Sequence, residues 1–267
     1  MKKTFKFLIV MLLGTYSFGQ SLDVSPSSDI KMVLIPEGVF EHNSLEIGVN
    51  GFWMSEEITN KQFREFIDDL KANPNDSLGL INLNKVMKGQ DLKNVITFYS
   101  YKDVLDNITY SKGWNGEHSF ENYFYSEKYN DYPVVGISFE SSRLFCIWKT
   151  RQLNNHREKN GLPYIADFRL PTEIEWLYAA QGTEEGNVQT AFSELRPSKS
   201  GDSNIYGLHN MNSNVSEWTI NKSEEGEGII KGSSWKKTIN INERIIKPVD
   251  YKSNSVGFRI IMSDLRE

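Results

Sequence analysis

Seven short blocks, spread over nearly the whole chain, most constrain what this protein can fold into. They lie at Met32–Phe40, Gly51–Phe63, Tyr132–Phe139, Phe168–Trp176, Tyr206–Trp218, Ile230–Trp235 and Val256–Ile260. Four tryptophans fall inside them, and a buried tryptophan covers roughly 150–250 Å², enough to hold irregular backbone in place. Long irregular stretches separate the blocks. We therefore expect a single α+β domain, rich in loops, with an aromatic core.

Three segments have the sequence features of helices. Thr59–Gln62 and Thr172–Glu175 are typical of capping boxes, in which a threonine hydroxyl and the side chain three residues later satisfy free N–H groups at a helix start. Apolar residues then follow each box at helical spacing. A further helix is predicted from Ser138 to about Arg157. Short strands are predicted at Met32–Ile35, Val134–Ile137, Ile229–Lys231 and Gly257–Met262.

The first nineteen residues have the layout of a secretory signal peptide. Lys2, Lys3 and Lys6 precede a short apolar run, and small residues follow near Ser17 and Gly19. Residues 20–30 would then form the N-terminal tail of an exported protein. No cysteine lies at the junction to carry a lipid, so we do not expect a lipoprotein. Loss of the three lysines takes the formal net charge from −5 to −8. This acidic balance makes a nucleic-acid partner unexpected, and no later apolar stretch is long enough to span a membrane.

Taken in order, the seven blocks resemble the formylglycine-generating enzyme, or sulfatase-modifying factor, family. They read MVLIPEGVF, GFWMSEEITNKQF, YPVVGISF, FRLPTEIEW, YGLHNMNSNVSEW, IKGSSW and VGFRI. The resemblance implies a C-type-lectin-like fold with a small twisted sheet, two to three helices and much irregular coil. It would form a single domain over residues 31–264, with an insertion at about 73–130.

The same resemblance implies copper(I) chemistry on two thiolates, because soft Cu(I) prefers thiolate ligands. The positions that match the family's cysteine pair are Lys237 and Asn242, and neither side chain can replace a thiolate. The only cysteine, Cys146, lies in an apolar helical stretch, where a buried inert thiol is expected. We therefore expect no copper and no catalytic residue of the family's kind. The four histidines are far apart in sequence and form no metal-binding pair.

The segment His209–Trp218 matches a turn that binds a structural Ca²⁺ in the family. Ca²⁺ takes six to eight hard oxygen ligands, and the resemblance places them at Asn212, Ser213, Val215 and Glu217. Ser213 stands where the family usually has glycine, which would strain the turn if that position needs a positive φ. The alternative is that the asparagines simply form turns and that Glu217 pairs with a buried arginine.

Tyr123–Asn154 is similar to the K- and J-type lipoproteins of gliding motility and type IX secretion in the Bacteroidetes. This similarity suggests an exported, non-catalytic binding or scaffold domain with a protein partner in the periplasm or at the cell surface. One alternative is a divergent oxidoreductase that acts on a peptide. Another is a lectin-like ligand binder. The sequence sets no oligomeric state.

Overall fold

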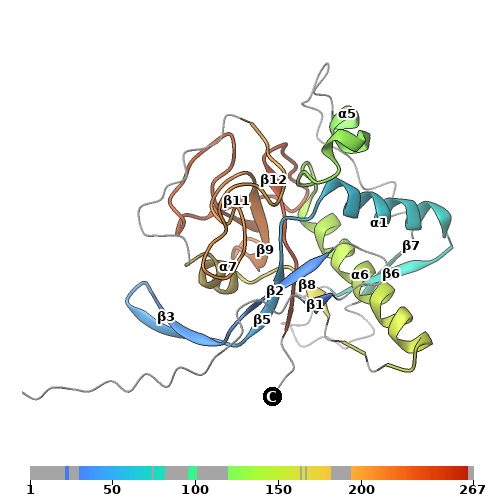
Figure 1. Cartoon of the computed structure of the whole chain (residues 1–267), viewed down its shortest axis with the longest axis horizontal. Coiled ribbons are helices and arrows are strands. Elements are labelled where there is room, and N and C mark those ends of the chain that lie inside the picture. Colours follow the sequence, from blue (N-terminus) through green and yellow to red (C-terminus); the bar gives the residue numbers. More distant parts are fainter. Residues whose placement is uncertain are drawn as a thin grey trace, which may run out of the picture.

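The computed structural model in Figure 1 describes most of the chain between residues 30 and 263. The described residues are 22–23, 30–73, 75–81, 96–100, 120–162, 164–165, 167–181 and 194–263. The predicted signal peptide, most of the predicted tail and much of the predicted insertion lie outside them. No described helix is both long enough and apolar enough to cross a membrane.

The main sheet joins segments from distant parts of the sequence. It has five strands in the order β1-β2-β5-β13-β8, and each pairs antiparallel with its neighbours. The strands are β1 (Leu22–Asp23), β2 (Lys31–Ile35), β5 (Phe52–Ser55), β8 (Phe168–Arg169) and β13 (Ile261–Ser263). Since β13 lies between β5 and β8, the sheet is complete only when this late segment is in place.

A second sheet carries most of the late blocks. Its order is β11-β10-β9-β12, and β12 runs parallel to β9 while the other pairs are antiparallel. The strands are β9 (Ser216–Lys222), β10 (Gly228–Lys231), β11 (Ile245–Lys247) and β12 (Val256–Gly257). Two hairpins complete the strands: β3 (Gly38–His42) with β4 (Leu45–Val49), which projects from the body in Figure 1, and β6 (Ser77–Ile81) with β7 (Ile96–Ser100).

Both predicted capping boxes are confirmed. Thr59 caps α1 (Asn60–Ala72) together with Gln62, and Thr172 caps α7 (Glu173–Ala180) together with Glu175. The middle helix, α6, runs from Phe139 to Lys159, and Ser138 is its N-cap. The shorter α5 (Phe120–Tyr125) and the 3-10 turn η2 (Glu127–Tyr129) precede it.

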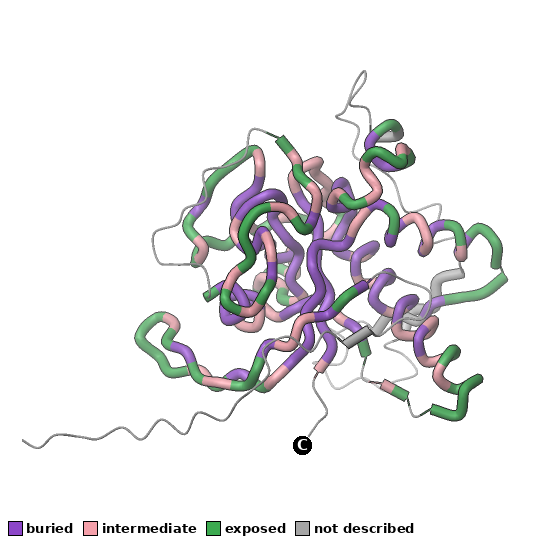
Figure 2. Tube along the Cα trace, viewed as in Figure 1, coloured by how far each residue is buried: buried purple, intermediate pink, exposed green. Residues whose placement is uncertain are grey.

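The core is aromatic, as predicted. The apolar stripe of α1 is completely buried against α6, where the rings of Phe63 and Phe145 stack at 5.6 Å. Trp176 and Trp218 are both fully buried. Figure 2 shows this buried material running through the centre of the molecule, with exposed residues at the β3–β4 tip and at the far end of α6. The predicted α+β class is thus confirmed.

Two strand predictions were wrong. Val134–Ile137 forms no strand, although these apolar residues are buried, because Gly136 turns the backbone at φ 74°. The segment instead approaches β12 so closely that a Cβ on Gly257 would lie 2.7 Å from the Val134 carbonyl oxygen. The predicted strand Gly257–Met262 is split between the two sheets, as β12 and β13. Its middle residue, Arg259, is fully buried where the chain crosses over.

Candidate functional site

Arg259 is the centre of a buried charged cluster, which we call the core cluster. Its Nε donates to Glu217 Oε1 at 2.7 Å, and its Nη1 donates to Glu56 Oε2 at 3.2 Å. Trp176 Nε1 donates to the other oxygen of Glu217 at 2.8 Å. Glu217 lies near the start of β9 and Glu56 directly follows β5, so one guanidinium joins the two sheets. These contacts match the alternative prediction in which Glu217 pairs with a buried arginine.

His209, one of the four histidines that lie far apart in sequence, belongs to this cluster, and its side chain is 23% exposed. Its Nδ1 lies 2.8 Å from Glu56 Oε1, and its backbone N–H donates to Glu56 Oε2 at 3.1 Å. Its carbonyl oxygen accepts from Arg259 Nη2 at 2.5 Å. The turn that begins at His209 is therefore fixed to the β5–α1 connection by both main-chain and side-chain contacts.

Glu57 is the third carboxylate of the core cluster and is only 1% exposed. Its Oε2 accepts from Asn214 Nδ2 at 2.8 Å, whereas its Oε1 has no hydrogen-bond partner among the described residues. Burial raises the pKa of Glu57 well above its ordinary value, and the positive charge of Arg259 only partly opposes this rise. One guanidinium thus faces three carboxylates, a charge imbalance that favours the protonated form of Glu57.

The turn at 209–218 is built differently from the prediction. The positive φ angles fall on Asn210 (57°) and Asn214 (60°), and Ser213 is not among the positive-φ residues. Asparagine tolerates this left-handed conformation better than most residues do. The expected strain at Ser213 is therefore absent, because two asparagines take the left-handed positions.

The predicted calcium ligands of this turn are partly engaged by protein donors. Both oxygens of Glu217 accept hydrogen bonds, and Asn212 Oδ1 accepts from the backbone N–H of Ser233 at 3.0 Å. Ser213 Oγ is buried with no partner in the described part of the chain, which fits a hard-oxygen site. No group of three or more His, Cys, Asp or Glu side chains among the described residues is arranged for a metal ion. Calcium at this turn stays a prediction.

Lys237 and Asn242, the positions that match the family's cysteines, lie on an exposed loop that we call the 236–244 loop. Lys237 Nζ lies 4.0 Å from Glu243 Oε1, with 70% of the lysine side chain exposed. The backbone N–H of Asn242 donates to Asn240 Oδ1 at 2.9 Å. Neither residue offers a soft donor atom, so the residues present do not fit a copper(I) ion.

A second charged group, which we call the α7 cluster, anchors this loop. Glu173 accepts two hydrogen bonds of 2.8 Å from Arg244 Nε and one of 3.3 Å from Lys231 Nζ. Lys231, whose side chain is fully buried, also donates to the Glu243 carbonyl at 2.9 Å. Burial raises the pKa of Glu173, but Arg244 and Lys231 outweigh it, so the pKa lies below its ordinary value. The α7 cluster also includes Arg169, which forms a bidentate pair with Glu175, both distances being 2.7 Å.

Cys146 lies inside α6 and is 2% exposed, as predicted. Burial raises the pKa of its thiol far above the ordinary value. Because the thiolate is the nucleophile and the metal ligand, this residue is inert in the folded protein.

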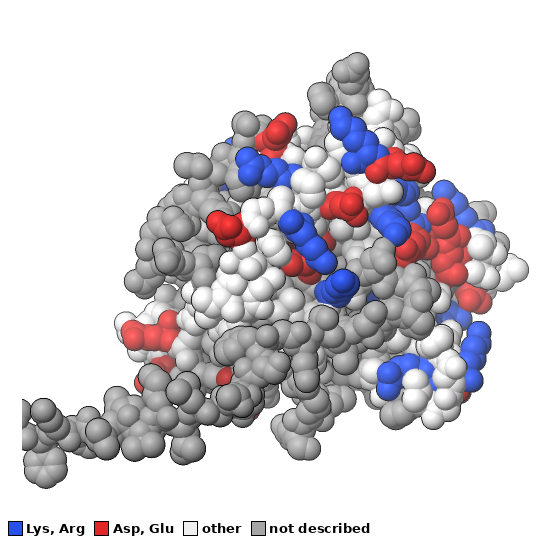
Figure 3. Space-filling model, viewed as in Figure 1, with Lys and Arg blue, Asp and Glu red and all other residues white. Residues whose placement is uncertain are grey.

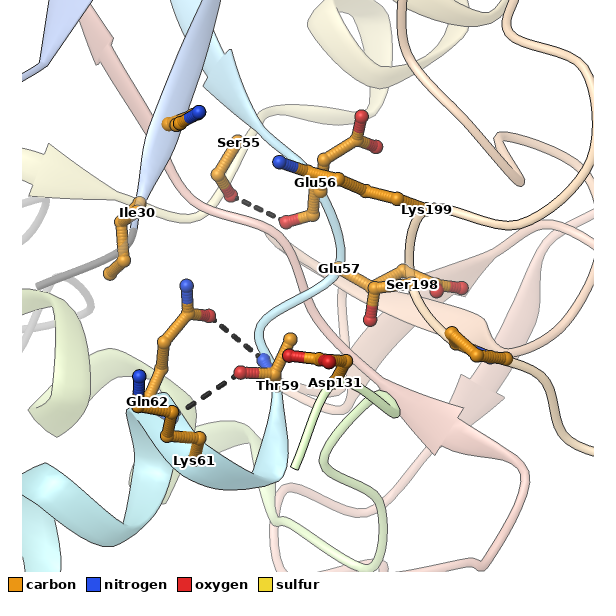
Figure 4. Close-up of a pocket in the computed structure, with 12 residues that line it drawn as sticks. Ile30, Ser55, Glu56, Glu57, Thr59, Lys61, Gln62, Asp131, Ser198 and Lys199 are labelled. Carbon is orange, nitrogen blue, oxygen red and sulfur yellow. Dashed lines mark hydrogen bonds between the residues drawn. The ribbon is translucent and has the colours of Figure 1, made fainter. Parts of the chain in front are cut away.

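A cavity of about 410 Å³ opens beside the core cluster, between the start of β2, the β5–α1 connection and the 197–199 loop (Figure 4). Glu56, Glu57 and Asp131 line it together with Ser198, Lys31, Lys61 and Lys199. None of its lining residues belongs to the 236–244 loop. Sequence reasoning missed this site, although the adjacent carboxylates Glu56 and Glu57 between apolar Met54 and Ile58 were a usable signal. Ser198, in a polar connector, gave none.

The two small sheets, the few helices and the long coil joined by buried arginine–carboxylate contacts define a formylglycine-generating-enzyme-like fold. The chain belongs to the sulfatase-modifying factor enzyme 1-like domain family, whose model matches residues 20–264.

Curated relatives and solved structures agree with this assignment. The chain is 23% identical to the inactive C-alpha-formylglycine-generating enzyme 2 of Bos taurus, over 90% of this chain and 91% of that protein. It is 25% identical to the Mus musculus protein of the same name, over 49% of each. Two solved structures share the fold, that of CarF and that of the Pseudomonas aeruginosa protein PvdO, each with a TM-score of 0.54 and 14% identity over 88% of this chain. The matches cover 98% of CarF and 94% of PvdO.

Proposed function

We propose that this chain is a non-catalytic member of its family that works as a binding domain in the cell envelope. One observation carries the proposal: the chain has a single cysteine, buried in α6, while the positions of the family's thiol pair hold exposed Lys237 and Asn242. A single cysteine cannot supply the two thiolates that the family's copper site requires. The similarity to relatives named as inactive formylglycine-generating enzymes also supports a non-catalytic role.

The proposal is tested first by restoring the missing chemistry. Lys237→Cys combined with Asn242→Cys should bind Cu(I) tightly, whereas the parent should not, because a near-linear pair of thiolates suits this ion. The matched control is Lys236→Cys with Asn240→Cys, two other exposed positions of the same loop. The parent should also leave a cysteine-containing substrate peptide unoxidised. Oxidation by the parent would overturn the proposal in favour of a divergent oxidoreductase, and equal copper binding by both double variants would show that Lys237 and Asn242 have no special placement.

Export and an envelope partner form the second part of the proposal. They rest on the signal-peptide layout of residues 1–19 and on the similarity of Tyr123–Asn154 to gliding-motility and type IX secretion lipoproteins. Figure 3 shows acidic and basic side chains interspersed over the upper and right parts of the coloured face, which does not form a basic patch of the kind that binds nucleic acid. Tagged protein at native abundance should be recovered from the envelope with secretion or motility proteins in stoichiometric amounts. Recovery from the cytosol, or alone, would contradict this part.

A structural calcium ion at Asn212, Ser213, Val215 and Glu217 is the third part. A ligand that binds only the folded state stabilises it by about 2.7 kcal/mol at one hundred times its Kd. Removal of calcium with EGTA should therefore lower the melting temperature by several degrees, and Ser213→Gly should keep this response. An EGTA-treated protein that melts at the same temperature would mean that the turn is held by its asparagines and by Arg259 alone.

A further inference from the structure

The cavity beside the core cluster has features of a ligand site that are separate from the family's reactive positions. Its volume of about 410 Å³ lies in the lower part of the range for small-molecule sites, roughly 300–1,000 Å³. Four chain segments close around it: Ile30–Lys31, the β5–α1 connection with the start of α1, Asp131 after η2, and Pro197–Lys199. Figure 4 shows Glu57 and Ser198 close to each other on one side, with Asp131 and Thr59 near them.

Two residues of the cavity wall have unused hydrogen-bonding capacity. Glu57 is 1% exposed and Ser198 is 2% exposed, and neither Glu57 Oε1 nor Ser198 Oγ finds a partner within the described part of the chain. A buried polar atom that lacks a partner costs about 1–3 kcal/mol. A ligand that brings hydrogen-bond donors to this wall would supply the missing partners.

The charges around the cavity indicate which donors fit. Glu56, Glu57 and Asp131 contribute three carboxylates, and the guanidinium of Arg259 is shared between Glu56 and Glu217. These acidic groups outnumber their buried cation, which favours the protonated form of Glu57, and a ligand that brings a positive charge would stabilise its carboxylate form instead. The described acidic and histidine side chains form no convergent metal-binding group. An organic ammonium, whose donors point in several directions, suits this dispersed set of acceptors better than a metal ion does.

The lysines of the lining add a second requirement. Lys31, Lys61 and Lys199 line the same cavity, and all three residues are exposed. A ligand that carried only a positive charge would meet these ammonium groups as it entered. A ligand with a carboxylate a few bonds away from its ammonium could instead pair the ammonium with the acidic residues and the carboxylate with the lysines. The lining contains no aromatic side chain among the described residues, so a stacked sugar ring is not favoured.

We propose that this cavity binds a small zwitterion, a free amino acid or a very short peptide, with its ammonium group at Glu57 and Ser198 and its carboxylate at the lysines. The site goes beyond the proposed envelope function and does not depend on it, because none of its residues takes part in the copper test above.

Calorimetric titration of the full chain with four probes tests the proposal. The probes are diglycine, N-acetylglycine (which lacks the ammonium), glycinamide (which lacks the carboxylate) and calcium chloride. Diglycine should bind most tightly. Loss of a charged hydrogen-bond partner is worth about 10- to 100-fold in affinity. N-acetylglycine and glycinamide should therefore each bind at least tenfold more weakly.

Three variants locate the binding. Glu57→Gln and Ser198→Ala should weaken diglycine binding at least tenfold, and Lys199→Ala should weaken it while leaving glycinamide unchanged. Glu41→Gln, an exposed glutamate on the β3–β4 hairpin, is the matched control and should have no effect. Should Glu57→Gln fail to fold, the Ser198 and Lys199 variants still decide the outcome. The proposal is overturned if no probe binds, if N-acetylglycine equals diglycine, or if calcium chloride alone binds in a Glu57-dependent way.

Discussion

The core cluster and the α7 cluster both pair buried or partly buried glutamates with arginine, yet the carboxyl pKa of Glu57 is raised and that of Glu173 is lowered. In the core cluster three carboxylates share one arginine, and burial raises the pKa of Glu57. In the α7 cluster Glu173 and Glu175 are matched by Arg169, Lys231 and Arg244, and both carboxyl pKa values lie below the ordinary one. Burial raises the carboxyl pKa in both clusters, and only in the α7 cluster do the neighbouring cations outweigh it. The first cluster joins the sheets, whereas the second anchors the loop that carries Lys237 and Asn242.

Removal of the central arginine should give the largest effect. Arg259→Met leaves Glu56, Glu57 and Glu217 buried without their cation, and breaking a buried pair costs about 3–5 kcal/mol. The control Arg169→Met, whose side chain is 35% exposed in the wild type, should cost about 1 kcal/mol or less, as for a partly exposed pair. Urea unfolding at pH 7 measures both. Equal losses would show that the two clusters do not differ in energy.

Glu173→Gln should destabilise the protein at neutral pH by about 1–2 kcal/mol, because two cations lose their charged acceptor. The folded-state pKa of Glu173 is lowered, so its stabilisation is present above the ordinary carboxyl pKa and disappears as the pH falls through the folded value. The difference between variant and wild type should therefore shrink below about pH 4. The free energy of unfolding measured from pH 7 to pH 3 tests this, and a constant difference would contradict it.

Glu57→Gln should behave in the opposite way. Since burial raises the folded-state pKa of Glu57, its favourable contribution is complete below the ordinary carboxyl pKa and is lost as the pH rises through the folded value. The free energy of unfolding of the variant should match that of the wild type near pH 4 and exceed it by about 1 kcal/mol at pH 8, without an added zwitterion. Chemical denaturation at the two pH values decides the point. A variant that is less stable at pH 8 would mean that Glu57 is ionised and needed.

Arg244→Ala should give the smallest effect on global stability. The side chain of Arg244 is 59% exposed, so its pair with Glu173 is screened and is worth about 0.5 kcal/mol. The local effect should be larger, because the 236–244 loop loses one of its two anchors. Proteolytic cleavage within this loop should become faster while the urea midpoint barely moves. An unchanged cleavage rate would show that buried Lys231 holds the loop alone.

Sequence reasoning succeeded where the determinants are local. The capping boxes Thr59–Gln62 and Thr172–Glu175 join residues three positions apart, so the helix starts follow directly from them. The strand prediction at Val134–Ile137 failed because a run of apolar residues predicts that the segment is buried but does not predict that it pairs with a neighbouring strand. The run in fact packs between elements and turns at Gly136.

The site was harder to predict than the fold, because its contacts join distant positions. Glu217 and Arg259 are 42 residues apart, and the pairing of Glu217 with an arginine was one of two predicted alternatives. Glu56 and His209 are 153 residues apart, and no local sequence pattern around either residue predicts their contact. Ser198 became a candidate only when the tertiary fold placed it in the lining of the same cavity as Glu57.

The place of β13 inside the main sheet has a consequence for how the chain is made. The hydrogen bond from the Ile260 backbone N–H to Ser55 Oγ closes a span of 205 residues, and β5 has no neighbour on that side until β13 arrives. Such long-range closure makes folding slow. A chain emerging from the ribosome therefore remains without its completed sheet, and without Arg259, until residues 259–263 have been synthesised. For the export that we propose, this delay would give a machinery that takes unfolded chains time to engage this one.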